Sequence, residues 1–189
     1  MLRGKLVNLR KATKNDVSLV MRWWNDQQYM GEYQDVVTFS KEEFERIMLH
    51  DTAFFIIEKN RTAIGHIGSW MQGRAMEIGF ALVPNERAKG FGTEAIQLIV
   101  DYLFLTKDIV RVQVSTDTEN IASQRALEKS GFVKEGTMRK LWYTRGEFRD
   151  HYLYSILKEE WEEPRKLART AQTNFHNKDN SAMSNHRNR

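Results

Sequence analysis

The sequence predicts an α/β domain in which a mixed, largely antiparallel sheet carries helices on both faces. Three β-prone runs separated by short polar turns lie between residues 53 and 83, which is typical of an antiparallel meander. A long amphipathic segment, Gly90 to Leu105, follows them and places its apolar side chains along one helical face. Strand and helix patterns then alternate as far as Trp161, without an internal repeat. One domain over residues 1–161 is therefore expected.

The first half of the chain is expected to begin with a strand and two helices and to end in the meander. A capping box formed by Ser40 and Glu43 opens the second helix, and the polar residues Lys59 to Thr62 are typical of a hairpin turn. The expected elements are a strand Lys5–Lys11, a helix Lys14–Asp26, an irregular segment Gln27–Phe39, a helix from Lys41 to about His50, and strands Ala53–Glu58, Ala63–Ser69 and Ala75–Val83.

The second half is expected to continue from the long helix with a strand, a helix and a second hairpin. Gly131 has the favoured left-handed position just past a helix end, and Thr144 to Glu147 form the hairpin turn. The expected elements are a strand Val110–Thr116, a helix Asn120–Ser130, and strands Thr137–Tyr143 and Arg149–Leu157. Residues 162–189 form an extension that starts with a helix over 165–172 or is flexible.

Composition narrows the class of protein. With 189 residues, of which 41% are apolar, the chain can bury one sizeable core. It contains no apolar run of roughly 18 residues and no signal-peptide core, so neither a membrane protein nor an exported one is expected. The absence of cysteine excludes disulfides and thiolate chemistry and fits a cytoplasmic location. Monomer and homodimer both remain open.

The positive charge lies mostly in the extension. Residues 162–189 contain six Lys/Arg and three Asp/Glu, which leaves +1 of the net +4 for the other residues. A basic surface that binds the phosphates of a nucleic acid is therefore not expected.

The stretch PNERAKGFGTEA, Pro84 to Ala95, places two glycines and two cations at the start of the long helix. A helix N-terminus presents unpaired N–H groups with a partial positive charge, and glycine lets a phosphate approach the backbone. Arg87 and Lys89 are expected to add two full charges. The stretch therefore suits a pyrophosphate, although a lone Gly-x-Gly would favour a simple tight loop.

A dinucleotide site is one interpretation of these glycines. Gly90, Gly92 and Ala95 satisfy G-x-G-x-x-G/A, and Asp117 follows them at about the sequence spacing that the fingerprint requires for the residue that contacts the ribose. However, the fingerprint needs its first glycine at the end of a strand, and six residues, Pro84 to Lys89, intervene here. An NAD(P) oxidoreductase thus remains an alternative. The Walker pattern fails because Lys89 precedes the glycine.

A second interpretation is a family resemblance. The run Arg87-Ala88-Lys89-Gly90-Phe91-Gly92 is similar to the R/Q-x-x-G-x-G/A signature of the GNAT superfamily of acyl-CoA-dependent N-acetyltransferases. Other segments resemble the ribosomal-protein (RimJ/RimL) branch in the same order along residues 1–161: Met76–Phe80, Asn120–Ser123, Glu128–Gly136, Arg145–Asp150, Tyr154–Leu157 and Glu160–Trp161. The resemblance implies the GNAT fold, acetyl-CoA as cofactor, and direct transfer of an acetyl group to a primary amine.

The resemblance also implies which residues hold the cofactor. They are the end of the strand, the glycine loop and the start of the next helix: Leu82, Val83, Arg87, Ala88, Lys89, Gly90, Phe91, Gly92, Thr93, Asn120 and Ser123. Asn120 and Ser123 have capping as an equally simple explanation.

Three positions are expected to carry the chemistry. Glu77 is the proposed general base, with a structural strand carboxylate as the alternative. The backbone N–H of about Val83 is the implied donor to the oxyanion. Many relatives place a Tyr general acid where this chain has Leu127, so Ser123 is the substitute that the branch suggests.

The acceptor site is expected to use Tyr29, Glu32, Tyr33 and Trp142, because acid and aromatic groups suit a cationic amine. The favoured acceptor is a protein N-terminal α-amine. The alternatives are a small amine, such as an aminoglycoside, another antibiotic or a polyamine, and a non-catalytic CoA-binding domain. The five histidines lack ligand spacing, so no metal is expected and each should be satisfied or exposed.

Overall fold

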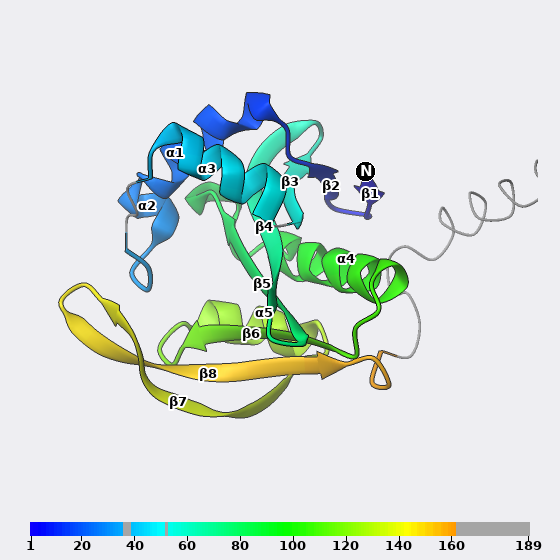
Figure 1. Ribbon diagram of the computed structural model, residues 1–189, viewed down its shortest axis with the longest axis vertical. Helices are drawn as coiled ribbons and strands as arrows, with labels where there is room; N and C mark the ends of the chain where they lie inside the picture. Colours follow the sequence, from blue (N-terminus) through cyan, green and yellow to red (C-terminus); the bar gives the residue numbers. More distant parts are fainter. Residues whose placement is uncertain (36–38, 52, 162–189) are drawn as a thin grey trace, which may run out of the picture.

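The computed structural model of the chain describes residues 1–35, 39–51 and 53–161. Eight strands form one sheet, and neighbouring strands are antiparallel except β5 and β6, which are parallel (Figure 1). The order across the sheet is β1-β2-β3-β4-β5-β6-β8-β7. The strands are β1 Leu2–Arg3, β2 Asn8–Lys11, β3 Ala53–Lys59, β4 Thr62–Gln72, β5 Ala75–Leu82, β6 Arg111–Asp117, β7 Val133–Thr144 and β8 Glu147–Leu157. This mixed sheet confirms the predicted fold class.

Helices lie on both faces of the sheet, as predicted. The helical elements are η1 Lys14–Asp16, α1 Val17–Trp24, α2 Gln27–Met30, α3 Lys41–Arg46, the π-helical turn η2 Ile47–Asp51, η3 Pro84–Glu86, α4 Phe91–Thr106 and α5 Ile121–Lys129. The predicted capping box is confirmed, since the Ser40 hydroxyl accepts from the Glu43 N–H and the Glu43 carboxylate accepts from the Ser40 N–H.

Strand alternation divides the apolar side chains between two cores. Phe55 and Ile57 of β3 point toward α4, whereas Phe54 and Ile56 pack with α1 and α3 on the other face. The larger core continues under α5 through Leu127. On the α1/α3 side of the sheet, the corresponding positions of β6 and β8 are mostly polar, including Gln113, Ser115, Asp117, Arg149 and His151.

The predicted strand Lys5–Lys11 is wrong in its first half, because β2 begins only at Asn8. The backbone N–H groups of Lys5, Leu6 and Val7 donate instead to the carboxylate of Glu94, at 3.0, 2.6 and 2.8 Å. A buried side chain of α4 thus supplies the acceptors that a neighbouring strand would otherwise provide.

The segment Gln27–Phe39 was expected to be irregular, but it begins with the short helix α2. The Asp26 carboxylate caps this helix by accepting from the Gln28 N–H at 2.8 Å. Strands β4, β7 and β8 also extend beyond the predicted limits. The extension 162–189 and its predicted helix lie outside the described residues. None of the described helices is both long and apolar enough to cross a membrane.

Candidate functional site

The centre of the sheet opens between β5 and β6. These parallel strands pair only at Met76 with Val112 and at Glu77 with Gln113. Beyond that point β5 continues to Leu82 and β6 to Asp117, and Figure 1 shows the two strands diverging. Two strand edges with free backbone groups therefore face each other across a split, where an extended amide-bearing ligand can bind.

The register with β4 fixes which backbone groups face this split. Val83 donates its N–H to the carbonyl of Ile64 at 2.9 Å, so the amide expected to meet the oxyanion is already engaged. The expectation that the Val83 N–H donates to the oxyanion is thus wrong, whereas a contact of Val83 with the cofactor stays a prediction. Because hydrogen bonding alternates along an antiparallel strand with an unbroken register, the amides of Phe80 and Leu82 point away from β4 and toward the split.

A run of unpaired amides follows in the loop before α4. From Ala88 to Thr93, six successive N–H groups have no hydrogen-bond acceptor among the residues that the structure describes. Ala88 and Gly90 have positive φ values of 59° and 85°, which turn successive amides toward one side. With the dipole of the 16-residue helix α4 behind them, these groups form an anion-binding concavity.

The two cations of this loop do not point into the concavity. Arg87 donates to the carbonyls of Leu82, Gln28 and Tyr29, at 3.0, 3.1 and 2.5 Å. Lys89 contacts the carbonyl of Asn85 and the carboxylate of Glu86. The expectation that both side chains add full charges at the phosphates is therefore corrected.

Lys59 also lies beside the loop and binds Glu86, at 3.2 Å. Two lysines and one glutamate leave one net positive charge there. Charge is thus available near the concavity, but the direct donors are backbone groups.

The start of α5 lies after β6, on the other strand of the split. The side-chain oxygen of Asn120 accepts from the Ser123 N–H at 3.1 Å, which is helix capping. This contact uses the oxygen of the amide and leaves its NH2 as a donor. Ser123 is half-buried, while Leu127 is fully buried in the core and has no proton to give.

Glu77 marks the vertex of the split, because it forms the last β5–β6 bridge. Its side chain is half-buried and lies on the α1/α3 side of the sheet, opposite the face covered by α4. Burial raises the pKa of the Glu77 carboxyl, and a hydrogen bond from Gln113 partly opposes that rise. A carboxylate with a raised pKa at this vertex is suited to accept a proton near neutral pH.

Tyr29 does not line an accessible acceptor site, contrary to expectation. Its side chain is 1% exposed, and its hydroxyl lies 2.7 Å from Nδ1 of His66 and 3.2 Å from the carbonyl oxygen of Ala81. Burial raises the pKa of Tyr29 and lowers the pKa of His66 to about 3, so both groups are neutral. The pair anchors α2 to the sheet.

The other expected acceptor residues lie near the tip of the β7–β8 hairpin. The ring of Tyr33 is 5.8 Å from the guanidinium carbon of Arg149, and Trp142 is the strand partner of Arg149. Trp142 is 56% exposed, and Glu32 is exposed as well. Tyr33 and Trp142, which are more than 100 residues apart in the chain, thus both lie beside Arg149.

Sequence reasoning missed Arg149, His151 and Arg145. Two of the three carboxylate partners of Arg149, Asp117 and Glu119, are 32 and 30 residues away in the chain, so no local pattern reveals them. The expectation of a satisfied or exposed side chain is wrong for His151, which is 8% exposed and has no hydrogen-bond partner for either ring nitrogen in the described part of the chain. Burial lowers its pKa.

These features fit coenzyme A. The amides from Ala88 to Thr93 suit its diphosphate, and the backbone N–H groups of Phe80 and Leu82 suit the carbonyl groups of its extended arm. Gly90 comes eight residues after the end of β5, too far along for the dinucleotide fingerprint.

Comparisons with known proteins agree with a site for coenzyme A. Residues 7–133 match the model of the acetyltransferase (GNAT) domain. The uncharacterized N-acetyltransferase p20 of Bacillus licheniformis is 29% identical over an alignment of 170 positions, and the alignment covers 82% of this chain and 94% of that protein.

Two solved structures have the same fold. Spermidine N-acetyltransferase from Vibrio cholerae, in complex with CoA and spermine, gives a TM-score of 0.74 at 21% identity over 84% of this chain and 99% of that one. RimJ of Mycobacterium smegmatis, in complex with CoA-disulfide, gives a TM-score of 0.70 at 21% identity, over 83% of this chain and 84% of that one. With a split sheet, a glycine loop lined by free amides and a family match over most of its domain, the chain belongs to the GNAT family of N-acetyltransferases, which use acetyl-CoA.

Proposed function

We propose that this N-acetyltransferase acetylates the N-terminal α-amine of a protein, by direct transfer in a ternary complex. The observation that carries the proposal is the position of Glu77, one half-buried carboxylate at the vertex of the split, on the side opposite α4. Acetyl-CoA supplies, when bound, a thioester that an amine can attack. The chain supplies the groups that hold it and a base for the proton of the amine.

Each role goes to a named group. The amides from Ala88 to Thr93 hold the diphosphate, and the amides of Phe80 and Leu82 replace that of Val83 as donors within the split. Glu77 accepts the proton from the amine, directly or through a water molecule. Ser123 stays the proposed proton donor to the leaving sulfur, because the buried Leu127 cannot serve.

The chemistry of the base favours an α-amine over a lysine side chain. At neutral pH about one α-amine in ten is unprotonated, against fewer than about one lysine in a thousand. A single carboxylate whose pKa is raised by burial can therefore complete the deprotonation of an α-amine. The exposed Trp142 and Tyr143 beside the expected acceptor loop also suit a peptide that continues into solvent.

A small polycationic amine is the second candidate. The observation that favours it is the cluster of Arg149 with the three carboxylates of Asp117, Glu119 and Glu147, whose net charge is −2 (three negative charges and one positive). Such a group attracts an amine that carries several positive charges.

Turnover tests decide between the two candidates. Purified protein and acetyl-CoA are incubated with N-terminal peptides of varied sequence and, in parallel, with spermidine and aminoglycosides, and thiol release is measured. We expect kcat/KM to be higher for a subset of the peptides than for the small amines. Efficient turnover of a small amine with no turnover of any peptide would reverse the assignment. A sample without the enzyme, run beside each substrate, reports the background rate.

A further inference from the structure

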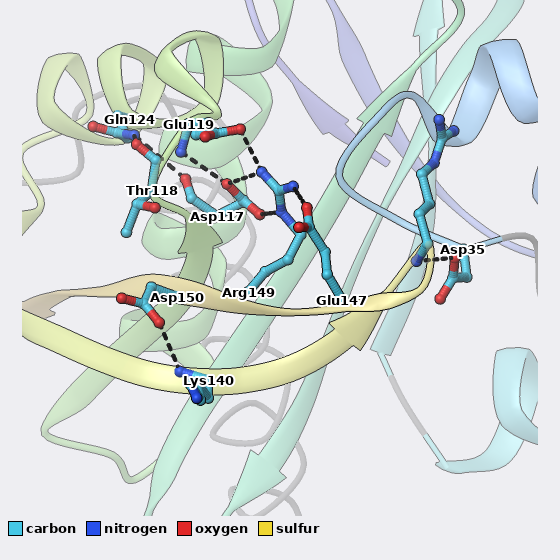
Figure 2. Close-up of polar contacts among 10 residues, drawn as sticks. Asp35, Asp117, Thr118, Glu119, Gln124, Lys140, Glu147, Arg149 and Asp150 are labelled. Atoms are coloured by element: carbon cyan, nitrogen blue, oxygen red, sulfur yellow. Dashed lines mark hydrogen bonds and ion pairs between the residues drawn. The ribbon is translucent and has the colours of Figure 1, made fainter.

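Arg149 connects several parts of the molecule through one guanidinium group. Figure 2 shows it between the carboxylates of Asp117, Glu119 and Glu147. Nε lies 2.5 Å from Asp117 and one terminal nitrogen lies 2.5 Å from Glu119, while the other terminal nitrogen contacts Glu147. The side chain of Asp117 is 1% exposed and that of Arg149 is 17% exposed, so their pair is shielded from solvent.

Asp117 in turn shapes the connection between β6 and α5. Its carboxylate accepts from the Glu119 N–H at 2.8 Å, and its carbonyl accepts from the Asn120 N–H at 3.0 Å. The side-chain amide of Gln124 closes the same turn onto the carbonyl of Thr118 at 2.9 Å. The turn held by Arg149 is therefore the one that presents Asn120 and Ser123 to the cofactor side of the split.

The opposite side of Arg149 meets the acceptor loop, Gly31 to Asp35. The Tyr33 ring lies 5.8 Å from its guanidinium carbon, within the range of a cation–π contact. Arg145, at the tip of the same hairpin, binds this loop independently of Arg149. Its N–H donates to Asp35 at 3.1 Å and its guanidinium donates to the carbonyl of Gly31 at 2.6 Å.

We propose that Arg149 is a positioning residue for acetyl transfer, which fixes the Asn120–Ser123 turn through Asp117 and the acceptor loop through Tyr33. One guanidinium thereby sets the distance between the two substrates. Arg145 supports the acceptor loop alone. The acceptor half of this inference rests on the proposed function, whereas the cofactor half does not.

The geometry predicts which of the two segments, the Asn120–Ser123 turn or the acceptor loop, each substitution disturbs. Arg149→Lys keeps one charge but cannot reach three carboxylates with a planar fork, so both the turn and the loop lose restraint. Tyr33→Leu and Arg145→Ala disturb only the loop. Arg139→Ala, on the exposed part of β7, is the matched control in the same hairpin.

The test measures the affinity for CoA alone by calorimetry, and separately KM for acetyl-CoA and for the best acceptor amine. For Arg149→Lys we expect CoA affinity to fall about fivefold to tenfold and the acceptor KM to rise by a similar factor. Tyr33→Leu and Arg145→Ala should raise the acceptor KM by about threefold to tenfold and leave CoA affinity within about twofold. Arg139→Ala should change neither.

Two results would overturn the proposal. A lowered melting temperature of Arg149→Lys with CoA affinity and both KM values within about twofold of the parent means a purely structural ion pair. A change in the acceptor KM alone means that the turn does not depend on Arg149. If Arg149→Lys does not fold, the double variant Arg149→Met with Asp117→Asn removes both charges together, and the same two measurements apply to it. Because CoA binding needs no acceptor, a wrong acceptor assignment leaves the cofactor half testable.

Discussion

The two sides of the split present different kinds of group, backbone amides on one side and side chains on the other. On the side of the glycine loop, the groups that we propose for the cofactor are the unpaired backbone amides of Ala88 to Thr93, and the nearby cations Arg87 and Lys89 contact the protein itself. On the side of the β7–β8 hairpin, the groups that we propose for the acceptor are side chains, such as Tyr33 and Arg149, that come from distant segments.

This difference separates what is general in the site from what is specific. Amide directions depend on φ and ψ, so a substitution that permits the loop conformation and adds no negative charge beside the amides should leave cofactor binding unchanged. A site made of side chains changes with each substitution, which lets relatives of one fold serve different acceptors. Substitutions on the two sides should therefore have separable effects on cofactor affinity and on turnover.

The largest effect is expected at Gly92. A Cβ added there would lie 3.6 Å from Phe80 and 3.7 Å from Leu82, which is ordinary contact, so Gly92→Ala should bind acetyl-CoA normally. Gly92→Glu places a negative charge beside the amides that face the diphosphate, and affinity should fall by about 100-fold or more. Calorimetry on both variants checks this. Binding by Gly92→Glu within about tenfold of the parent would contradict a backbone-built site.

The next effect is expected at Glu77. Glu77→Gln should bind acetyl-CoA as the parent does, while kcat falls by about 100-fold because the proton acceptor is lost. In the parent, kcat should fall as pH drops through the raised pKa of Glu77, since the protonated carboxyl cannot accept a proton. That acid limb should vanish in the variant. A pH profile from 6 to 9 that is the same for both proteins would exclude Glu77 from the mechanism.

An intermediate effect concerns the support of α2 by His66. The pKa of His66 in the folded state is about 3, below the ordinary value of 6.5. As the pH falls below 6.5, His66 therefore becomes protonated in the unfolded state while it stays neutral in the folded state. Stability should therefore fall with acid, by about 2 kcal/mol between pH 7.5 and pH 5. Urea unfolding at several pH values measures it. The pH dependence should be smaller in His66→Gln, and an equal slope in both proteins would assign it to other groups such as His151.

The smallest effects are expected at the loop cations. Arg87→Ala removes the bonds to the carbonyls of Leu82, Gln28 and Tyr29 from a largely exposed side chain, and should cost about 1 kcal/mol of stability. Lys89→Ala should cost less than about 0.5 kcal/mol, with acetyl-CoA affinity within about threefold. If Lys89→Ala lowered the affinity for acetyl-CoA as strongly as Gly92→Glu does, the charge of the lysine side chain would be shown to hold the phosphates.

Local signals in the sequence were sufficient for several elements. The Ser40 capping box, the hairpin turn at Asn60 and Arg61 and the helix after Gly90 depend on neighbours in the chain, and the structure has them where they were predicted. The start of β2 was misplaced because Glu94, nearly 90 residues away, binds the amides of Lys5, Leu6 and Val7.

The sequence by itself determined the order of strands and helices, the glycine loop and the presence of Glu77 on the strand before it, because periodicity and turn chemistry are local properties. Only the tertiary structure decided which amides face the split, that Tyr29 is buried, and that Arg149 lies between the turn after β6 and the loop Gly31 to Asp35. Strand register and burial depend on partners far along the chain, and no window of sequence contains both partners.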